Sequence, residues 1–232
     1  MNIASEPHIG RDVRQREIVP PDKLAACHAL VIGVGAIGRQ VALQLAAIGM
    51  PRMTLYDHDA VEIENLAPQG YWADDLKSLK VHASAAACRR INPEIEIMPV
   101  PERFRRSTAK QLVSDDRLVA FVCVDSIETR QLVWESLRRV ASLFLDGRMS
   151  AEVIRVLAVA QPETDAYYAT TLFAPEQAYA GSCTAKSTIY TASVAAGLMI
   201  GQFTRWLRQM PVDPDVTLNL LSMELASDLQ LA

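Results

Sequence analysis

The sequence is poor in the residues that build disulfide-linked, zinc-binding and membrane-spanning proteins. Its four cysteines, at positions 27, 88, 123 and 183, are scattered, and none belongs to a C-x-x-C pair. This spacing argues against a disulfide framework and a structural zinc site, so no zinc is expected. The longest apolar run, residues 192–200, is far shorter than the roughly 20 residues of a membrane-crossing helix, so no membrane partner is expected.

Positive charge is scarce as well. The chain has 23 Lys and Arg against 27 Asp and Glu, a net charge of −4, and so lacks the basic field that attracts nucleic acid. We interpret the small cluster of Arg103, Arg105 and Arg106 as a solvated loop or helix start. Residues 1–16 are polar and show no secretory signal, and with the scattered cysteines they predict a cytoplasmic protein.

What the chain does contain is a glycine-rich turn between a strand pattern and a helix pattern. Apolar residues 29–32 lead into Gly33-Val34-Gly35-Ala36-Ile37-Gly38, a helical pattern spans Ala36–Ile48, and Asp57 ends the next strand. Glycines at these places permit a tight turn, close approach to phosphate and close helix–strand packing. We therefore expect Gly33, Gly35, Ala36 and Gly38 to bind a nucleotide at the helix N-terminus, with Asp57 accepting from the ribose hydroxyls.

Strand and helix patterns alternate along the first two thirds of the chain, and strands dominate the remainder. The 232 residues suit one domain, with an N-terminal arm (1–21), a nucleotide-binding half (22–150) and a C-terminal half (151–232). The alternation predicts an α/β fold with a doubly wound, mostly parallel sheet and antiparallel strands in the C-terminal half. Helices are expected at 22–26, 36–48, 74–91, 108–114, 127–140 and 188–207. Strands are expected at 29–32, in the residues that end at Tyr56, and at 94–100, 118–124, 142–146, 153–160, 165–170 and 217–225.

The segment after the second strand argues against hydride chemistry. Residues 57–69, DHDAVEIENLAPQ, resemble the D-x-D-x-V-x-x-x-N-L-x-R-Q signature of the E1-like adenylating enzymes, the ThiF/MoeB/HesA family. Residues 11–15 resemble that family's R-x-x-R-Q, and Lys80, Asn92-Pro93 and Asp125 with Arg130 follow in the family's order. The resemblance covers roughly residues 11–225. It implies a Rossmann-like E1 fold with a crossover loop near 172–187.

The same resemblance implies an adenylyltransferase that uses ATP and Mg²⁺. Its substrate would be the C-terminal carboxylate of a small ubiquitin-like or sulfur-carrier protein ending in Gly-Gly. Asp125 would hold the metal, although it could instead cap the helix that starts near Ser126. Lys80, within the predicted helix, would contact phosphate. Arg14 would reach the triphosphate of a partner subunit, which implies a homodimer, although a frayed tail is the alternative.

Three more residues match the family's pattern, and a fourth, Cys183, lies near the place where relatives have a cysteine. Asn65 would donate to phosphate or ribose, or form an Asx-turn; Asp59 is the second acid of D-x-D, or caps the loop; and Gln69 closes the signature. Cys183, in the crossover, would accept the activated C-terminus as a thioester or acyl disulfide, or would be structural. We interpret Arg130 as half of a structural salt bridge, His58 as a loop histidine, and the cysteines at 27, 88 and 123 as core residues.

Pro68 is the main departure from the family pattern. The family has an arginine there, and proline can supply neither a charge nor an N–H. We expect another arginine to substitute, with Arg148 as the candidate. The missing cation also leaves open a non-catalytic, E1-like partner subunit. An NAD(P)-dependent oxidoreductase is a further alternative, which rests on the glycine turn alone.

Overall fold

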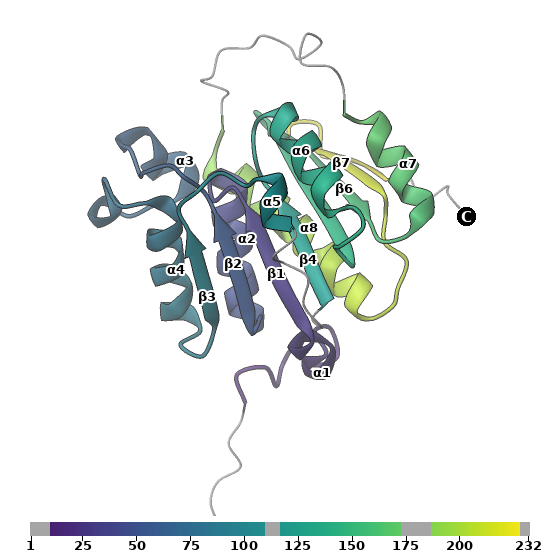
Figure 1. Cartoon of the computed structure of the whole chain (residues 1–232), viewed down its shortest axis with the longest axis horizontal. Coiled ribbons are helices and arrows are strands. Elements are labelled where there is room, and N and C mark those ends of the chain that lie inside the picture. The colour runs from purple at the N-terminus through teal and green to yellow at the C-terminus, as the bar shows by residue number, and fades with distance from the viewer. Residues whose placement is uncertain (1–9, 110–116, 173–186, 228–232) are drawn as a thin grey trace, which may run out of the picture.

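A single mixed sheet with helices on both faces organises the protein (Figure 1). The computed structural model describes residues 10–109, 117–172 and 187–227. The eight strands lie in the order β3-β2-β1-β4-β5-β6-β7-β8. Along the chain the elements are α1 (Pro21–Ala25), β1 (Cys27–Ile32), α2 (Ala36–Ile48), β2 (Arg52–Tyr56), η1 (Ile63–Asn65), α3 (Leu66–Gln69), η2 (Ala73–Asp75), α4 (Lys80–Ile91), β3 (Glu96–Val100), α5 (Arg106–Ala109), β4 (Arg117–Val122), α6 (Ile127–Leu137), β5 (Leu143–Ser150), β6 (Val153–Val159), α7 (Pro162–Thr170), α8 (Ile189–Leu207), β7 (Asp215–Asn219) and β8 (Glu224–Ser227).

The parallel half of the sheet brings several strand ends to one edge. Strand β1 pairs in parallel with β2 on one side and with β4 on the other, and β3 and β5 extend the sheet outward. The carboxyl ends of these strands therefore share an edge, which we call the carboxyl edge. Successive strands are added toward β3 on one side of β1 and toward β5 from β4 onward, so the strand order reverses between β1 and β4. Ligands of such sheets bind outside the carboxyl ends of the strands at this point.

The strands after β5 run antiparallel. Strand β5 turns back into β6, which pairs with β7, which in turn pairs with β8. The predicted fold class, a doubly wound and mostly parallel sheet with an antiparallel C-terminal half, is confirmed. The expected crossover near 172–187 falls almost wholly outside the described residues.

One predicted strand is wrong. Residues 165–170, expected to pair with the strand before them, belong to helix α7 instead. Pro162 occupies its first turn, where a missing N–H costs nothing. The helix buries Tyr168, whose ring packs on Trp134 and Phe144 at centroid distances of 4.5 and 5.1 Å. Aromatic packing across the sheet face thus decides the conformation of this segment.

Several other predicted elements differ in their bounds; the predicted strand 142–146, for example, continues to Ser150. The expected strand 217–225 is a hairpin, because Asn219 accepts hydrogen bonds from the N–H groups of Leu221 and Ser222 and turns the chain between β7 and β8. The expected helix 74–91 starts only at Lys80. The residues before it form a short 3-10 turn, and Lys77 has a left-handed φ of 68°. Lys80 is therefore the first residue of a helix and not an interior one.

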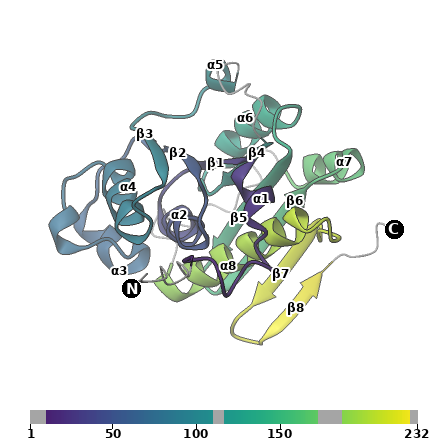
Figure 2. The same ribbon diagram turned by 90° about the horizontal axis from the view of Figure 1, so that it is seen from below.

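Two helical layers cover the sheet (Figure 2). Helices α2, α4 and α8 cover one face, where residues such as Leu45, Met199 and Phe203 are fully buried. Helices α5, α6 and α7 cover the other face, around Trp134 and Phe144. None of the helices in the described parts of the chain has the length and apolarity that a bilayer crossing requires.

Two glycines allow α2 to approach the sheet closely. Gly33 has a φ of 84°, and a Cβ there would lie 2.9 Å from the carbonyl oxygen of Cys123. A Cβ on Gly38 would lie 1.8 Å from the carbonyl oxygen of Gly33. Both contacts are with backbone, so a side chain could be accommodated only if α2 or the strand ends moved.

Replacing Gly38 with alanine should therefore destabilise the fold. We expect Gly38→Ala to lower the free energy of unfolding by about 2 kcal/mol or more, as overpacking does. The matched control is Gly201→Ala in α8, where a Cβ meets no atom within 4 Å; it should be neutral or stabilising by up to about 1 kcal/mol. Urea unfolding of the two variants measures the difference, and equal stabilities would contradict this packing.

Candidate functional site

The glycine turn lies at the carboxyl edge and is tied to the end of β2. Gly33 donates its N–H to the carbonyl of Tyr56 at 2.7 Å, and Val34 donates to Asp57 Oδ2 at 2.8 Å. Gly35 is the N-cap of α2, and no side chain caps the helix. An added Cβ on Gly35 would meet only Gln69 Oε1, at 4.0 Å. The helix start thus offers free N–H groups and partial positive charge to open space, which suits an anion.

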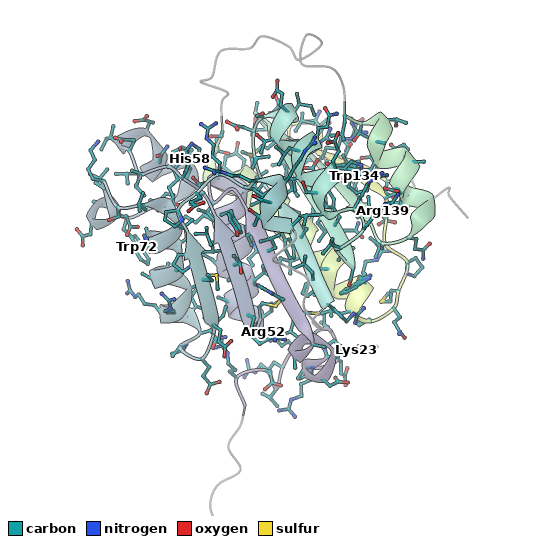
Figure 3. The ribbon with its side chains drawn as sticks, viewed as in Figure 1. Lys23, Arg52, His58, Trp72, Trp134 and Arg139 are labelled. Carbon is teal, nitrogen blue, oxygen red and sulfur yellow. The ribbon has the colours of Figure 1, made fainter. Side chains whose placement is uncertain are left out.

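Asp57 supports the turn from the neighbouring strand. Each of its carboxylate oxygens accepts one backbone N–H, from Val34 at 2.8 Å and from Asp59 at 2.9 Å. A carboxylate oxygen has a second lone pair, so Asp57 keeps acceptor capacity for a hydroxyl. Next to it, His58 accepts from Arg103 at 3.1 Å, and it lies at the carboxyl edge, while Arg52, which begins β2, lies at the opposite edge (Figure 3).

Lys80 lies beside both the acids and the glycine turn. Its side chain is only 8% exposed, and its Nζ is 3.0 Å from Asp59 Oδ2. The carbonyl oxygens of Lys80 and Val34 both lie within 3.5 Å of the Tyr71 hydroxyl oxygen, so the start of α4 and the turn are neighbours. The ammonium group of Lys80 is therefore held near the N-terminus of α2, where it can exchange its carboxylate partner for a phosphate.

The N-L-A-P-Q segment follows η1 and forms α3. Asn65 Oδ1 accepts from the N–H of Glu62 at 2.9 Å as part of a capping box at η1, and not in the Asx-turn considered for it. This bond leaves its amide N–H₂ to donate elsewhere. Gln69 Oε1 is buried and has no partner among the described residues. This orphaned acceptor faces the start of α2. A buried polar atom without a partner is costly, and a bound ligand would satisfy it.

Asp125 lies beyond the end of β4, on the other side of the glycine turn. It is exposed, and its charge interacts with the buried Arg130 guanidinium, but no hydrogen bond or ion pair joins its carboxylate to another described residue. Helix α6 is capped by Ser126, whose Oγ accepts from the Thr129 N–H at 3.1 Å. The alternative role of Asp125 as this helix cap is therefore wrong. The contact of Gly33 with the Cys123 carbonyl keeps this strand end beside the turn, and an exposed carboxylate there suits a hard cation.

Arg14 is held at the other end of the molecule. Arg11 donates to the carbonyls of Ala46 and Ala47 at 3.2 and 3.3 Å, and Gln15 donates to that of Ile48 at 2.8 Å. These contacts fix the arm to the C-terminus of α2, whose 13 residues separate it by about 20 Å from the glycine turn. Arg14 itself is exposed. The structure therefore does not bring Arg14 to the glycine turn of its own chain. The other predicted catalytic residue, Cys183, lies outside the described residues.

Arg148, the expected substitute for the missing arginine, is committed elsewhere. Its Nε donates to Asp146 at 2.8 Å, and its two terminal nitrogens donate to Thr171 at 2.9 and 3.0 Å. Asp146 is fully buried, accepts also from Tyr168, and pairs with Arg130, whose pKa burial lowers to about 10. The predicted salt bridge of Arg130 is confirmed. Arg148 belongs to this structural network beneath α7 and does not reach the glycine turn.

Sequence patterns did not single out Tyr71 and Arg39. The Tyr71 hydroxyl donates to the Val34 carbonyl at 2.6 Å, and the Arg39 guanidinium lies 4.1 Å from the centre of the Tyr71 ring. Neither residue belongs to a motif. The signals available were an arginine on a helix directly after the third glycine and an aromatic residue two positions after the signature's last glutamine. Only the folded arrangement connects them to the turn.

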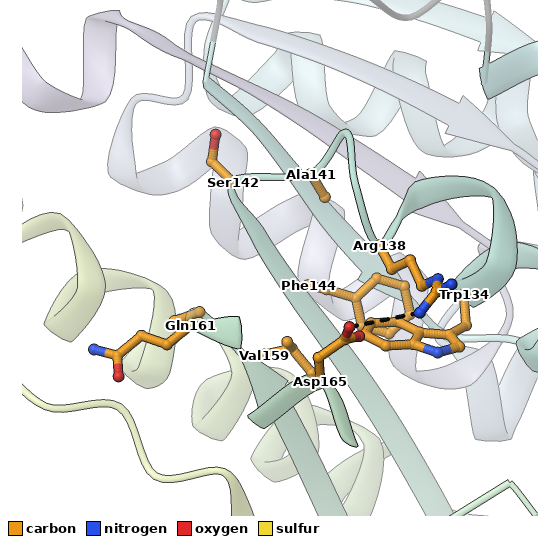
Figure 4. Close-up of a pocket in the computed structure, with 9 residues that line it drawn as sticks. Trp134, Arg138, Ala141, Ser142, Phe144, Val159, Gln161 and Asp165 are labelled. Atoms are coloured by element: carbon orange, nitrogen blue, oxygen red, sulfur yellow. Dashed lines mark ion pairs between the residues drawn. The ribbon is translucent and has the colours of Figure 1, made fainter. Parts of the chain in front are cut away.

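A pocket of about 230 Å³ lies between α6 and α7 (Figure 4). Trp134 and Phe144 form its aromatic wall, and Arg138 and Asp165, which also line it, form an ion pair at 3.6 Å. Ser142, just before β5, and Ala160, just after β6, also line it. They place it toward the edge opposite the glycine turn, so the pocket is separate from the candidate site.

Comparisons with known proteins identify the family of this chain. Residues 10–228 match the ThiF family. The chain belongs to the ThiF family. It is 36% identical over 126 residues to the adenylyltransferase and sulfurtransferase MOCS3 of Sus scrofa, covering 51% of this chain and 28% of MOCS3. It is 33% identical over 110 residues to the molybdopterin-synthase adenylyltransferase of Salmonella typhimurium, covering 47% and 44% of the two chains.

Solved structures share the ThiF fold over nearly the whole chain. PaaA superimposes with a TM-score of 0.74 at 17% identity, covering 98% of this chain and 84% of PaaA. Escherichia coli MccB, solved with AMPCPP and MccA, gives a TM-score of 0.73 at 15% identity, covering 94% and 71%. At these identities the likeness concerns the fold. This ThiF-family chain spans less than half the length of the two curated relatives.

Arg148 should matter for stability and not for nucleotide use. Replacing it with alanine removes three hydrogen bonds and leaves the buried Asp146 with fewer donors. We expect Arg148→Ala to lower the free energy of unfolding by about 1–3 kcal/mol. ATP–pyrophosphate exchange per folded molecule should keep its KM for ATP. A variant that is as stable as the parent but has lost exchange would instead restore Arg148 as a phosphate-binding cation.

Proposed function

We propose that this chain is an ATP-dependent adenylyltransferase that activates the C-terminal carboxylate of a small ubiquitin-like or sulfur-carrier protein. The observation that carries the proposal is the convergence at one edge of an uncapped helix N-terminus, the ammonium group of Lys80 and the exposed carboxylate of Asp125. These groups supply fixed positive charge and a cation ligand for a triphosphate. ThiF-family membership, and relatives named as adenylyltransferases, support the proposal.

The residues present fit ATP. Gly33, Gly35, Ala36 and Gly38 would bind phosphate through backbone N–H groups, as the open space at Gly35 allows. The orphaned Oε1 of Gln69 needs a donor, which a nucleotide hydroxyl or amine would supply. Asp57 would accept from the ribose, and Asp59 would yield its ion pair with Lys80 to phosphate.

Asp125 would hold Mg²⁺, which would neutralise charge on the phosphates. Asn65 would donate its free amide N–H₂ to phosphate or ribose. A nucleotide held in this way is consistent with the binding of AMPCPP by the MccB structure, which shares this fold.

The reaction requires two anions to meet. An oxygen of the substrate carboxylate attacks the α-phosphorus of ATP and forms an acyl–phosphate bond, while the bond from the α-phosphorus to the bridging oxygen breaks. Pyrophosphate leaves with that electron pair. Catalysis is then mostly positioning and charge neutralisation, which is what the helix start and Lys80 can provide. Cys183 would subsequently accept the acyl group from AMP through its thiolate.

The carrier protein would end in Gly-Gly, as the resemblance to the E1-like family implies for its substrates. Relatives named for molybdopterin synthase and for sulfur transfer support a sulfur-carrier protein as partner. We also propose a cytoplasmic location, because the cysteines are scattered along the sequence and none belongs to a C-x-x-C pair.

We also propose a homodimer, and the position of Arg14 supports it. This arginine lies about 20 Å from its own glycine turn, the length of α2, and so cannot serve it. It is exposed and would reach the triphosphate of the partner subunit. A guanidinium binds phosphate through two parallel hydrogen bonds.

A second candidate function is a non-catalytic partner subunit. Pro68 stands where the family has an arginine, and Arg148 is engaged with Asp146 and Thr171. The site is thus one cation short of the family pattern. Nucleotide binding without pyrophosphate exchange would favour this function. The oxidoreductase alternative rested on the glycine turn alone, and the family match removes its basis.

Loss of Lys80 or Asp125 should abolish exchange. With ATP, Mg²⁺, labelled pyrophosphate and a carrier protein ending in Gly-Gly, Lys80→Met and Asp125→Asn should each lower exchange by about 100-fold or more, as loss of one transition-state contact does. The matched control is Lys77→Met, which removes a 75% exposed lysine paired with Glu62. Surface pairs contribute little, so this variant should stay within about twofold of the parent. Equal activity of Lys80→Met and Lys77→Met would contradict the proposal.

Mixing two inactive variants should restore activity if Arg14 acts across a dimer. Arg14→Ala and Lys80→Met should each be inactive as homodimers. After subunit exchange, a mixed dimer carries one site with both residues intact, so about a quarter of parental activity should return for a twofold-symmetric dimer. Recovery is measured by pyrophosphate exchange, with each variant alone as control. No recovery, although mass spectrometry detects mixed dimers, would mean that Arg14 does not act in trans.

A further inference from the structure

We propose that Tyr71 is a positioning residue whose hydroxyl fixes the Val34 peptide, and with it the direction of the N–H groups that the glycine turn offers to phosphate. The identity of the ligand rests on the proposed function, whereas the effect of Tyr71 on the conformation of the glycine turn does not. Arg39 supports Tyr71 in this role, because its guanidinium packs on the Tyr71 ring.

The hydrogen bonds at Tyr71 have a defined direction. Its Oη lies 2.6 Å from the Val34 carbonyl oxygen, 3.1 Å from Ser84 Oγ and 3.5 Å from the Lys80 carbonyl oxygen. Carbonyl oxygens only accept, so the single hydroxyl proton goes to the nearer one, that of Val34. Ser84 Oγ then donates to Tyr71 Oη. Ser84 is fully buried and Tyr71 is 4% exposed, so water does not compete for these bonds.

Both backbone polar groups of Val34 are held. Its N–H is bound by Asp57 Oδ2 at 2.8 Å and its C=O by Tyr71 at 2.6 Å. The Val34 carbonyl shares a peptide unit with the N–H of Gly35, the N-cap of α2. A peptide unit is planar, so fixing the carbonyl of Val34 also fixes the direction of the Gly35 N–H. In this way Tyr71 sets the orientation of the first donor in the proposed phosphate site.

Tyr71 also joins the turn to the start of α4. The same hydroxyl oxygen that binds Val34 lies beside the Lys80 carbonyl and bonds Ser84, one turn further along the helix. The Tyr71 side chain therefore connects the two parts of the site that would bind phosphate, which are the glycine turn and Lys80.

Arg39 holds the tyrosine in place. It is 1% exposed, its Cζ lies 4.1 Å from the centre of the Tyr71 ring, and its Nε donates to the Gly70 carbonyl at 3.1 Å. Its terminal nitrogen Nη2 lies 4.0 Å from Asp75 Oδ2. The centre of the Trp72 ring lies 5.5 Å from the Arg39 Cζ. Burial of an arginine is costly unless the charge finds partners, and these partners all belong to the segment that carries Tyr71.

A core role alone does not account for the hydroxyl. Phenylalanine would fill the same space and keep the contact with Arg39, without placing a polar group in the interior. Burial raises the pKa of Tyr71, so the hydroxyl stays protonated and remains a donor. The hydroxyl therefore has a specific task, which is the bond to Val34.

The test compares Tyr71→Phe with Tyr167→Phe. Tyr167 on α7 donates to Asp215 at 2.6 Å, remote from the turn, so the control also loses one hydroxyl hydrogen bond of the same length. Steady-state pyrophosphate exchange should show a KM for ATP raised roughly three- to tenfold by Tyr71→Phe, the equivalent of one net hydrogen bond. Its kcat should stay within about twofold, because binding and not chemistry is altered. Tyr167→Phe should leave both constants within about twofold of the parent.

A second measurement does not depend on turnover. Amide hydrogen exchange, read by NMR without nucleotide, should be faster at Val34, Gly35 and Ala36 in Tyr71→Phe than in the parent, and unchanged in Tyr167→Phe. Unchanged amide exchange together with an unchanged KM would overturn the role of Tyr71 while leaving the proposed function intact. A parent protein that lacks pyrophosphate exchange would instead overturn the proposed function, and the amide data would still decide whether Tyr71 sets the turn.

Discussion

The close contact of α2 with the ends of β1 and β4 is the constraint on which the rest of the site depends. A Cβ on Gly38 would lie 1.8 Å from the Gly33 carbonyl oxygen, and Gly33 itself has a left-handed φ. This contact carries the uncapped N-terminus of α2 to the carboxyl edge, where its N–H groups and partial positive charge face outward. Asp57 and Lys80 are arranged around that helix end, and Asp125 stands on its other side.

The parts of the fold that could be predicted from sequence are those determined by local pattern. Helix α2 matches its prediction at both ends, since its apolar period and Gly49 in the left-handed C-cap are local signals. The buried strands β1 and β4 appear as apolar runs, and Thr188 caps α8 where the pattern predicted its start. The glycine turn and Asp57 were found because their motif follows a strand end. The functional roles of these residues stay predictions.

The features that sequence did not predict depend on partners far along the chain. Residues 165–170 form a helix because Tyr168 packs on Trp134 and Phe144 from two other elements. Arg148 binds Asp146 and Thr171, and no local pattern announces Thr171 as its partner. Tyr71 and Arg39 likewise belong to no motif, and their connection to Val34 exists only once α2, α3 and α4 have packed together. Tertiary contacts thus decide which arginine is structural and which tyrosine supports the turn.

The most direct test of the central claim is a crystal structure of the protein with a non-hydrolysable ATP analogue and Mg²⁺. The triphosphate should lie over the N-terminus of α2, with Lys80 Nζ moved from Asp59 to a phosphate oxygen and Asp125 beside the metal. A nucleotide bound elsewhere, or bound here with Lys80 still paired to Asp59 and Asp125 turned away from the metal, would contradict it.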